Sequence, residues 1–556
     1  MPKQLKKWGR RLLLGAVVLG LAGWSGGAWL LRRCVARPPP LPADVSIMQR
    51  QPEVRAGRTW LGQSWVARRE GLLVVRLKGS PFELGYAAGR LLPEQIHTLE
   101  NEFLAMIRGY VPQPWKVSVL KSYVLYANRH LSDFVAADYR QEIHGTIRGC
   151  PDRHPELGDY YNRMLNYHAA QDVSYLLIDN PLVARAGCTA FGAWGGATPN
   201  QHLLTGRNFD WEAAEVFSRD RVVILCEPDG GIPFISLAWA GMTGVVSGLN
   251  RAGVSVTLNG APSRLPGDTA TPVAMVARDV LQQAHNLAEA LVIIRRAPVF
   301  VSTLWLVGSR ADGKFIVVEK TPAATQVREP DSDAIICANH FQTAGLREDA
   351  CNQNYVAEAT SASRFTRLTE LVRDAHGTLD PARAVEMLRD RRLPGGRFAG
   401  NGHRATLNAS IATHATVMDL TDGIFWAASP PHQLGKFVAF DVHDFERELP
   451  ALTVAADPQV TSGEFARTQQ AQQALAAGHR ALHSNDAPAA LAAAAQAEAA
   501  NPGFYQNAAL RGRALQQLGR GAEAAQAFET ALAQHPALRS EKHELEGRLQ
   551  QVRGRK

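Results

Sequence analysis

Hydrophobic residues follow three successive patterns along this chain. An uninterrupted apolar run fills residues 12–31, and apolar residues three and four apart dominate residues 100–180. From Cys188 to about Val442, short apolar and β-branched runs alternate with Gly and Asn turns. The spacing of three and four is typical of helices, and the short β-branched runs are typical of strands. The chain is therefore predicted to contain a helical region followed by a domain rich in sheet.

Individual elements follow from the same pattern. A strand is predicted over 71–77, and the turn at 79–85 leads into a helix over 86–99 that Pro93 kinks or restarts. Strands grouped around helices indicate an α+β layered domain rather than alternating βαβ units. The further strands are predicted at 188–194, 202–204, 221–226, 245–249, 254–258, 303–307, 314–319 and 334–337, with helices at 271–296 and 363–375.

The apolar run at 12–31 holds 20 uncharged residues, about enough to cross a bilayer as a helix. Five basic residues precede the run and three follow it closely, which predicts a cytoplasmic N-terminus and a folded part on the extracytoplasmic side of a bacterial-type inner membrane. A cleavable signal peptide, followed by secretion, is the alternative. Prolines between 38 and 42 form a stiff spacer, and folded structure is expected from near Thr59.

The C-terminal part, residues 462–556, is rich in Ala, Gln, Glu and Arg and repeats with a period of 34. This spacing resembles tetratricopeptide repeats, in which small residues let paired helices pack closely. An alanine-rich helical hairpin without repeats is the alternative. Two repeats make a small surface, so we expect them to dock onto the catalytic domain or to bind one protein partner. The recurring pairs are Gly478 and Gly512, Ala490 and Ala524, Ala497 and Ala531, and Pro502 and Pro536.

Composition narrows the function classes. The formal net charge is +8, but seven of the basic residues flank the apolar run at 12–31. The rest of the chain is nearly neutral, so its charge gives no indication of nucleic-acid binding. The six cysteines form no CxxC pair, which argues against zinc and leaves Cys337 and Cys351 as a candidate disulfide in an exported protein. Serine-elbow, dinucleotide and Walker motifs are absent. No cofactor or metal is expected.

The candidate chemistry centres on Cys188, which follows Gly187 directly at the head of a predicted strand. In a hairpin, the next strand would carry Arg207 and Asp210 back past this cysteine. Attack of the thiol on the Gly187 carbonyl would give a thioester that water cleaves, leaving Cys188 as a new N-terminus. Its α-amine could then act as the base for its own thiol. The alternative is a buried structural cysteine, the usual role of such a residue.

The runs G-C-T-x-F at 187, G-R-N-F-D at 206, N-G at 259, A-N-H-F at 338 and S-x-S-R-F at 361 resemble one family over residues 70–440. It is the penicillin acyltransferase family of N-terminal-nucleophile hydrolases, which is related to choloylglycine hydrolase. The resemblance implies a four-layer αββα sandwich, self-cleavage between Gly187 and Cys188, and a small-molecule acyl substrate. The implied roles are nucleophile for Cys188, thiol activation for Arg207, amine binding for Asp210, oxyanion donors for Asn259 and Asn339, and a further arginine near the nucleophile for Arg364.

Each of these assignments has a structural alternative. Arg207 and Asp210 could form a surface ion pair in a turn, and Asn259 could belong to a hairpin turn with Gly260. Arg364 could lie at an exposed helix start. His340 is expected to be structural rather than a base.

Together these observations predict a membrane anchor (1–33), a Pro-rich linker (34–58), a propeptide region (59–187), a catalytic region (188–450) and the repeats (462–556). The predicted function is hydrolysis of an N-acyl amide through an acyl-enzyme on Cys188, with acyl transfer to an amine as the alternative within the class. A thiol hydrolase that does not cleave itself is a third hypothesis. A membrane-tethered interaction protein with an inert sandwich is the hypothesis from another class.

Overall fold

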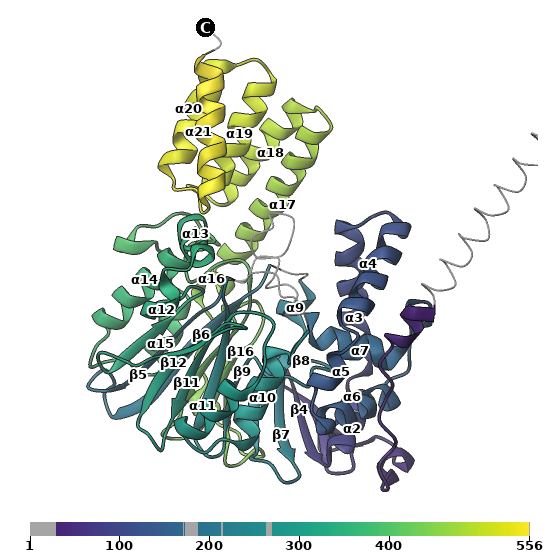
Figure 1. The fold of residues 1–556 in the computed structure, drawn as a ribbon. Helices are drawn as coiled ribbons and strands as arrows, with labels where there is room; N and C mark the ends of the chain where they lie inside the picture. The colour runs from purple at the N-terminus through teal and green to yellow at the C-terminus, as the bar shows by residue number, and fades with distance from the viewer. Residues whose placement is uncertain (1–28, 171, 173–186, 213–214, 263–268, 555–556) are drawn as a thin grey trace, which may run out of the picture.

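Two stacked β-sheets form the centre of the molecule, with helices on both outer faces (Figure 1). The computed structural model describes residues 29–170, 172, 187–212, 215–262 and 269–554. Most of the predicted anchor at 12–31 lies outside the described residues. In the part of the chain that is described, no helix combines the length and the apolar character needed to span a bilayer.

The larger sheet has eleven strands, and its neighbours are antiparallel except at one junction. There β4 and β7 run parallel, with Leu73 opposite Val222. This junction joins the region before Cys188 to the region after it, so the two parts share one sheet. In sheet order the strands are β1 (Glu53–Arg55), β2 (Arg58–Leu61), β3 (Ser64–Arg69), β4 (Leu72–Gly79), β7 (Arg221–Pro228), β8 (Phe234–Trp239), β9 (Ser247–Asn250), β10 (Val254–Gly260), β11 (Thr303–Ser309), β12 (Lys314–Lys320) and β13 (Thr325–Arg328).

The smaller sheet is entirely antiparallel and packs on the larger one through a shared apolar core. Phe315 of β12 fills the space above Gly192 of the facing sheet, where a Cβ atom would overlap its ring. Its ring also lies 5.8 Å from that of Trp194. In sheet order the strands are β14 (Ala334–Cys337), β5 (Thr189–Gly195), β6 (Gln201–Asp210), β15 (Ala412–Asp419), β16 (Ile424–Ala428) and β17 (Phe437–Asp441).

Helices complete the layers. The outer face of the larger sheet packs against α2 (Pro81–Leu91), α10 (Val273–Gln283) and α11 (Leu287–Arg296), and that of the smaller sheet against α14 (Ser361–Asp374) and α15 (Pro381–Leu388). An α+β core with stacked sheets is therefore present, as the sequence predicted. The other helices of this part are α3 (Pro93–Tyr110), α4 (Pro114–Ala127), α5 (Leu131–Phe134), α6 (Ala137–Gly149), α7 (Tyr160–His168), α9 (Val216–Arg219), α12 (Ala344–Arg347) and α13 (Ala350–Glu358).

Several predicted boundaries were wrong. The single helix expected over 271–296 is two helices, because Asn286 caps the start of α11 by accepting a hydrogen bond from the Glu289 N–H at 3.0 Å. Strand structure begins at Glu53 rather than near Thr59. The proline spacer does not stand away from the domain, since the side chain of Gln141 donates a hydrogen bond to the Pro40 carbonyl at 2.8 Å.

Helices α2 and α6 cross at backbone contact because glycines face each other at the crossing. A Cβ atom at Gly85 would overlap the carbonyl of Glu142, and one at Gly145 would overlap that of Phe82. No rotamer change relieves a clash with backbone, so the helices must move apart.

We therefore expect Gly85→Ala to lower the free energy of unfolding by at least about 2 kcal/mol, because an extra methyl group overpacks this crossing. Gly109→Ala is the matched control, since Gly109 is also helical and has nothing within 4 Å of its added Cβ. Thermal unfolding followed by circular dichroism should show a lower midpoint for the first variant and an unchanged or slightly higher one for the second. Equal midpoints for the two variants would contradict this account of the crossing.

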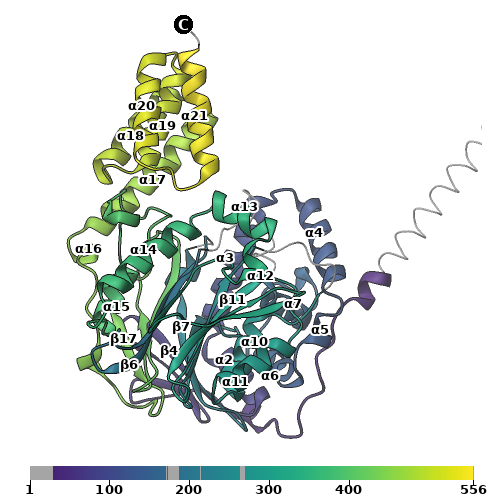
Figure 2. The same cartoon turned by 60° about the vertical axis from the view of Figure 1, so that its left-hand side comes forward.

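The C-terminal helices form a separate layered unit on the part that contains the two sheets (Figures 1 and 2). Gly478 of α17 (Glu464–His483) packs against Leu510 of α19 (Tyr505–Gln517), and Gly512 of α19 packs against Phe528 of α20 (Gly521–Ala533), so both repeated glycines lie at contacts between helices. The Asn501 side chain accepts a hydrogen bond from the Asn401 N–H and donates one to the Asn401 carbonyl, both at 3.0 Å. These bonds join the C-terminal helices to the part that contains the two sheets. The assignment as tetratricopeptide repeats stays a prediction. The other helices of this unit are α16 (Pro458–Thr461), α18 (Ala487–Ala500) and α21 (Arg539–Arg553).

Candidate active site

The predicted hairpin is present and brings Cys188 beside the end of β6. Strands β5 and β6 are antiparallel, with Thr189 opposite Asn208, and the Gly187 N–H donates a hydrogen bond to the Asp210 carbonyl at 2.8 Å. Arg207 and Asp210 lie within β6 rather than in a turn after it, and both are fully buried. The surface ion-pair alternative is therefore wrong.

The Cys188 thiol is buried and faces a guanidinium. Nη2 of Arg207 lies 3.7 Å from Sγ and also donates to the Leu258 carbonyl, while Nη1 donates to Ser247 at 2.5 Å. Burial raises the pKa of the Cys188 thiol, and the positive charge of Arg207 opposes that rise. The site therefore contains the group that would stabilise a thiolate once the thiol loses its proton.

Asp210 supplies a buried carboxylate without a hydrogen-bond partner. Neither side-chain oxygen is bonded to another described residue, although the group is completely buried. Burial raises the pKa of Asp210 to about 7, against the opposing charges of Arg364 and Arg207. A buried acceptor of this kind is costly unless another group completes it.

The space around Gly187, directly before Cys188, does not require a glycine. A Cβ atom there would lie 3.5 Å from Nη2 of Arg364 and 3.6 Å from Cβ of Asp210, which is ordinary contact. The folded structure therefore has room for a methyl group at position 187.

Arg364 connects the backbone at Cys188 to the side chain of Asn339. It is fully buried in the first turn of α14, so the exposed alternative is wrong. Nη1 donates to the Cys188 carbonyl and the Thr189 hydroxyl, and Nη2 donates to Oδ1 of Asn339 at 2.8 Å. These bonds fix the backbone on the C-terminal side of the Cys188 thiol.

Asn259 and Asn339 tie the ends of the two sheets together. Nδ2 of Asn259 donates to the Ala338 carbonyl at 2.9 Å, and Nδ2 of Asn339 donates to the Gly260 carbonyl at 2.8 Å. Asn259 lies inside β10 opposite Leu304, so its hairpin-turn alternative is wrong. An amide carries two N–H groups, and Asn259 also reaches Cys337, whereas Asn339 has one bonded acceptor. Of the two, Asn339 keeps an N–H for an oxyanion.

His340 and Cys337 have structural surroundings. Nδ1 of His340 lies 2.7 Å from Oγ of Ser361, and burial lowers the pKa of this imidazole to about 4. Cys337 is buried in β14 and is not in a disulfide, so the candidate pairing with Cys351 is not formed.

Sequence reasoning missed His414 and Ser247, which hold the other side of Arg207. Nε2 of His414 lies 3.2 Å from both Nη1 of Arg207 and Oγ of Ser247. Burial holds the pKa of His414 well below its usual range, so a neutral imidazole accepts from the guanidinium. The sequence signal was a histidine within the run 412–419, which forms the fully buried strand β15.

An apolar cavity of about 110 Å³ lies next to this centre. Phe209 forms part of its wall and also lies under the Arg207 guanidinium, 4.4 Å from ring centroid to Cζ. Helices α3 and α7 supply the opposite wall, and Trp211, Phe217 and Trp239 supply the rest of the aromatic lining. The aromatic side chains following G-R-N-F-D were the sequence signal for this cavity.

Potential metal ligands gather elsewhere. In the part of the chain that is described, one group of His, Cys, Asp or Glu side chains is close enough to hold an ion, and it consists of His202, Asp419 and Asp422. It lies at the opposite end of β6 from Asp210. One oxygen of Asp419 already accepts from the Thr421 N–H at 2.9 Å.

Comparison with known proteins identifies several relatives. An uncharacterized protein of Archaeoglobus fulgidus is 25% identical over 452 residues, which cover 75% of this chain and 70% of the relative. Protein dcd1B of Dictyostelium discoideum is 25% identical over 274 residues, 47% of this chain and 52% of the relative, so the chain spans about half of that protein.

Solved structures are similar at lower identity. A Caenorhabditis elegans ortholog of N-acylethanolamine-hydrolyzing acid amidase shares 19% identity over 42% of this chain and 93% of its own, with a TM-score of 0.32. A mutant of conjugated bile acid hydrolase from Clostridium perfringens shares 16% identity over 47% of this chain and 95% of its own, with a TM-score of 0.34.

Residues 197–413 match the family model named acyl-coenzyme A:6-aminopenicillanic acid acyl-transferase. The match begins after Cys188. It includes the other candidate site residues, which are Arg207, Asp210, Asn259, Asn339 and Arg364. It does not extend to the C-terminal helices. Through this region the chain is similar to the acyl-coenzyme A:6-aminopenicillanic acid acyl-transferase family.

Proposed function

We propose that the chain activates itself by cleavage between Gly187 and Cys188 and then hydrolyses an N-acyl amide through an acyl-enzyme on Cys188. The observation that carries the proposal is the buried, unpartnered carboxylate of Asp210 beside this peptide bond, on the same strand as the Arg207 guanidinium that faces the thiol. A free α-amine on Cys188 would complete that carboxylate.

Cleavage begins with attack of the Cys188 thiol on the Gly187 carbonyl. The C–N bond breaks, the thiol proton passes to the nitrogen, and the acyl part moves to sulfur. Water then cleaves the thioester, releasing the Gly187 carboxyl group and regenerating the thiol. The new α-amine has an ordinary pKa of about 8, so it can accept the thiol proton in the next step.

In the mature enzyme the thiolate attacks the amide carbonyl of the substrate. Asp210 stabilises the α-ammonium, Arg207 stabilises the thiolate, and Asn339 is the better placed amide for the developing oxyanion. The ammonium returns its proton to the leaving amine, and water releases the acyl group from sulfur. The cavity bordered by Phe209 and Trp239 favours an apolar acyl group.

A substrate panel tests the proposal. The purified chain is incubated with N-acyl amino acids, bile-salt-like amides, β-lactams and N-acyl homoserine lactones, and product amines and the intact protein mass are followed. We expect turnover of amides with apolar acyl groups and, after rapid acid quenching, a transient acyl adduct on the Cys188 peptide. Cys351→Ser is the control and should retain both. Turnover that persists in Cys188→Ala, or an adduct on another residue, would overturn the assignment.

A further inference from the structure

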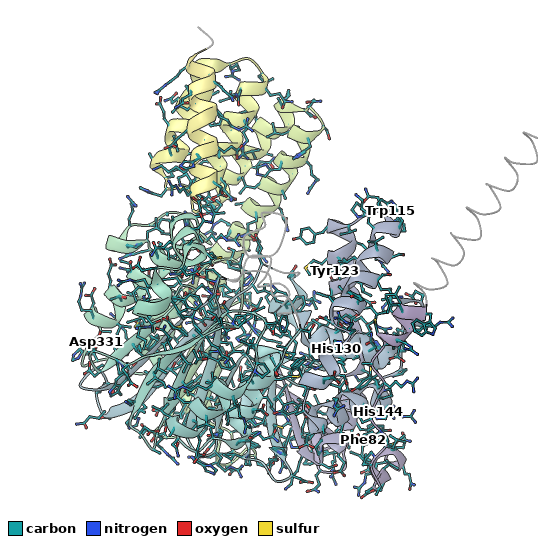
Figure 3. All side chains as sticks on the ribbon, in the orientation of Figure 1. Phe82, Trp115, Tyr123, His130, His144 and Asp331 are labelled. Atoms are coloured by element: carbon teal, nitrogen blue, oxygen red, sulfur yellow. The ribbon has the colours of Figure 1, made fainter. Side chains whose placement is uncertain are left out.

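Among the helices that precede Cys188, α4 carries the most exposed apolar side chains. Trp115, Val119, Tyr123 and Tyr126 are 65%, 58%, 66% and 46% exposed, and their spacing of four, four and three residues places them on one face of the helix. Among described helices of eight or more residues, α4 is the one that buries no residue. Figure 3 shows Trp115 and Tyr123 on this helix at the edge of the molecule.

The charged residues of α4 and of the segments next to it in the sequence have one sign. From residue 103 to residue 132 the sequence contains no Asp or Glu, while Arg108, Lys116, Lys121 and Arg129 supply four positive charges. Lys116 lies over the Trp115 ring at 5.7 Å, and Arg129 lies over Tyr126 at 4.5 Å. Aromatic and aliphatic side chains bordered by lysine and arginine are typical of a helix that lies in a membrane interface, where anionic headgroups complement the basic residues.

The start of the described chain lies on the same side of the molecule. Residues 29–33 form a helical turn near α7 (Figures 1 and 2), and Trp29 and Leu30 are 56% and 46% exposed. The chain is then fastened to α7, since the Ala36 N–H donates to the Asn162 side chain at 3.0 Å. The first described residues therefore lie beside the helices that precede Cys188.

We propose that the exposed face of α4 docks into the interface of a phospholipid bilayer that contains anionic lipid. The four apolar side chains insert at headgroup depth, and the basic residues around them contact lipid phosphates. This membrane docking does not depend on the chemistry proposed for Cys188, because the experiment below measures contact with lipid and not enzyme activity.

A site-specific fluorescence experiment tests the docking. An environment-sensitive fluorescent amino acid is placed at position 119 of the full chain, and in a second protein at position 292. Val292 on α11 is the matched control, because it is also an exposed valine, at 60%. Each protein is reconstituted into vesicles of phosphatidylcholine and phosphatidylglycerol carrying a nitroxide-labelled lipid, and only protein that floats with the vesicles is measured.

We expect lipid-dependent quenching at position 119 to exceed that at 292 by at least about twofold, with a blue shift at 119 alone. Lys116→Glu should reduce the quenching at 119 while leaving the thermal midpoint unchanged, since the Lys116 side chain is exposed. Equal quenching at the two positions, or a failure to float, would overturn the proposal. A blue shift at 119 that is already present in detergent would show that another segment covers α4. A shift that grows with protein-to-lipid ratio without quenching would show that a second copy does, and either result would reject the membrane.

Discussion

Cys188→Ala should leave the chain as a single band at about the full mass of 60.5 kDa on a denaturing gel, whereas the unsubstituted chain should give two fragments, residues 1–187 and 188–556. The reason is that the alanine removes the only atom proposed to attack the Gly187 carbonyl. Under native conditions both proteins should elute as one species. The parallel pairing of β4 with β7 and the buried ion pair of Glu142 with Arg278 hold the first fragment against the second.

Three companion proteins make this result specific. Cys188→Ser retains an attacking oxygen and should cleave more slowly than the unsubstituted chain. Gly187→Ala should fold, because a methyl group fits at this position, and any slowing would then reflect the cleavage step itself. Cys351→Ser should cleave normally. If the unsubstituted chain stays intact, self-cleavage is wrong, and labelling of Cys188 by a thiol-reactive probe then separates a thiol hydrolase from an inert interaction protein.

The sequence predicted the parts of the site that follow from strand order and local motifs. An apolar run, a polar turn and a second run were enough to place Cys188 opposite the end of β6, with Arg207 and Asp210 on the returning strand. Short apolar and β-branched runs between Gly and Asn turns also predicted nine of the strands that the structure contains. These inferences depend on neighbours close in the chain.

Contacts between segments far apart in the sequence could not be predicted in this way, because no local pattern records them. His414 reaches Arg207 from 207 residues away, and Ser247 reaches it from a strand of the other sheet. Asn259 bonds the backbone next to Asn339, and Asn339 bonds the backbone next to Asn259. These bonds join distant segments, so no local pattern could decide between a hairpin turn and a tertiary role for Asn259. The cavity wall likewise combines helices before Cys188 with strands after it.

Asp210→Asn should have opposite effects on stability and on activity. In the uncleaved Cys188→Ala background the carboxylate is buried without a partner, and its pKa of about 7 lies above the ordinary value of 3.8. The folded state therefore holds a proton that the unfolded state releases, and stability falls as pH rises from about 4 to about 7. One pKa unit corresponds to about 1.4 kcal/mol, so asparagine should remove a penalty of up to about 4 kcal/mol at pH 8 and little near pH 4.

The measurement compares thermal midpoints of Cys188→Ala with and without Asp210→Asn at pH 4.5 and at pH 8. We expect the advantage of asparagine to appear at pH 8, while the same substitution in the cleavable chain should lower turnover by about 100-fold or more, because the α-ammonium loses its partner. Asp172→Asn is the matched control. Asp172 is also buried, has a pKa raised to about 8, and leaves one oxygen without a partner, but its other oxygen accepts from the Val273 N–H at the start of α10. It should reproduce the pH-dependent stabilisation with normal cleavage and turnover. If Asp210→Asn instead retains full turnover, the carboxylate does not hold the α-amine and the role proposed for Asp210 is wrong.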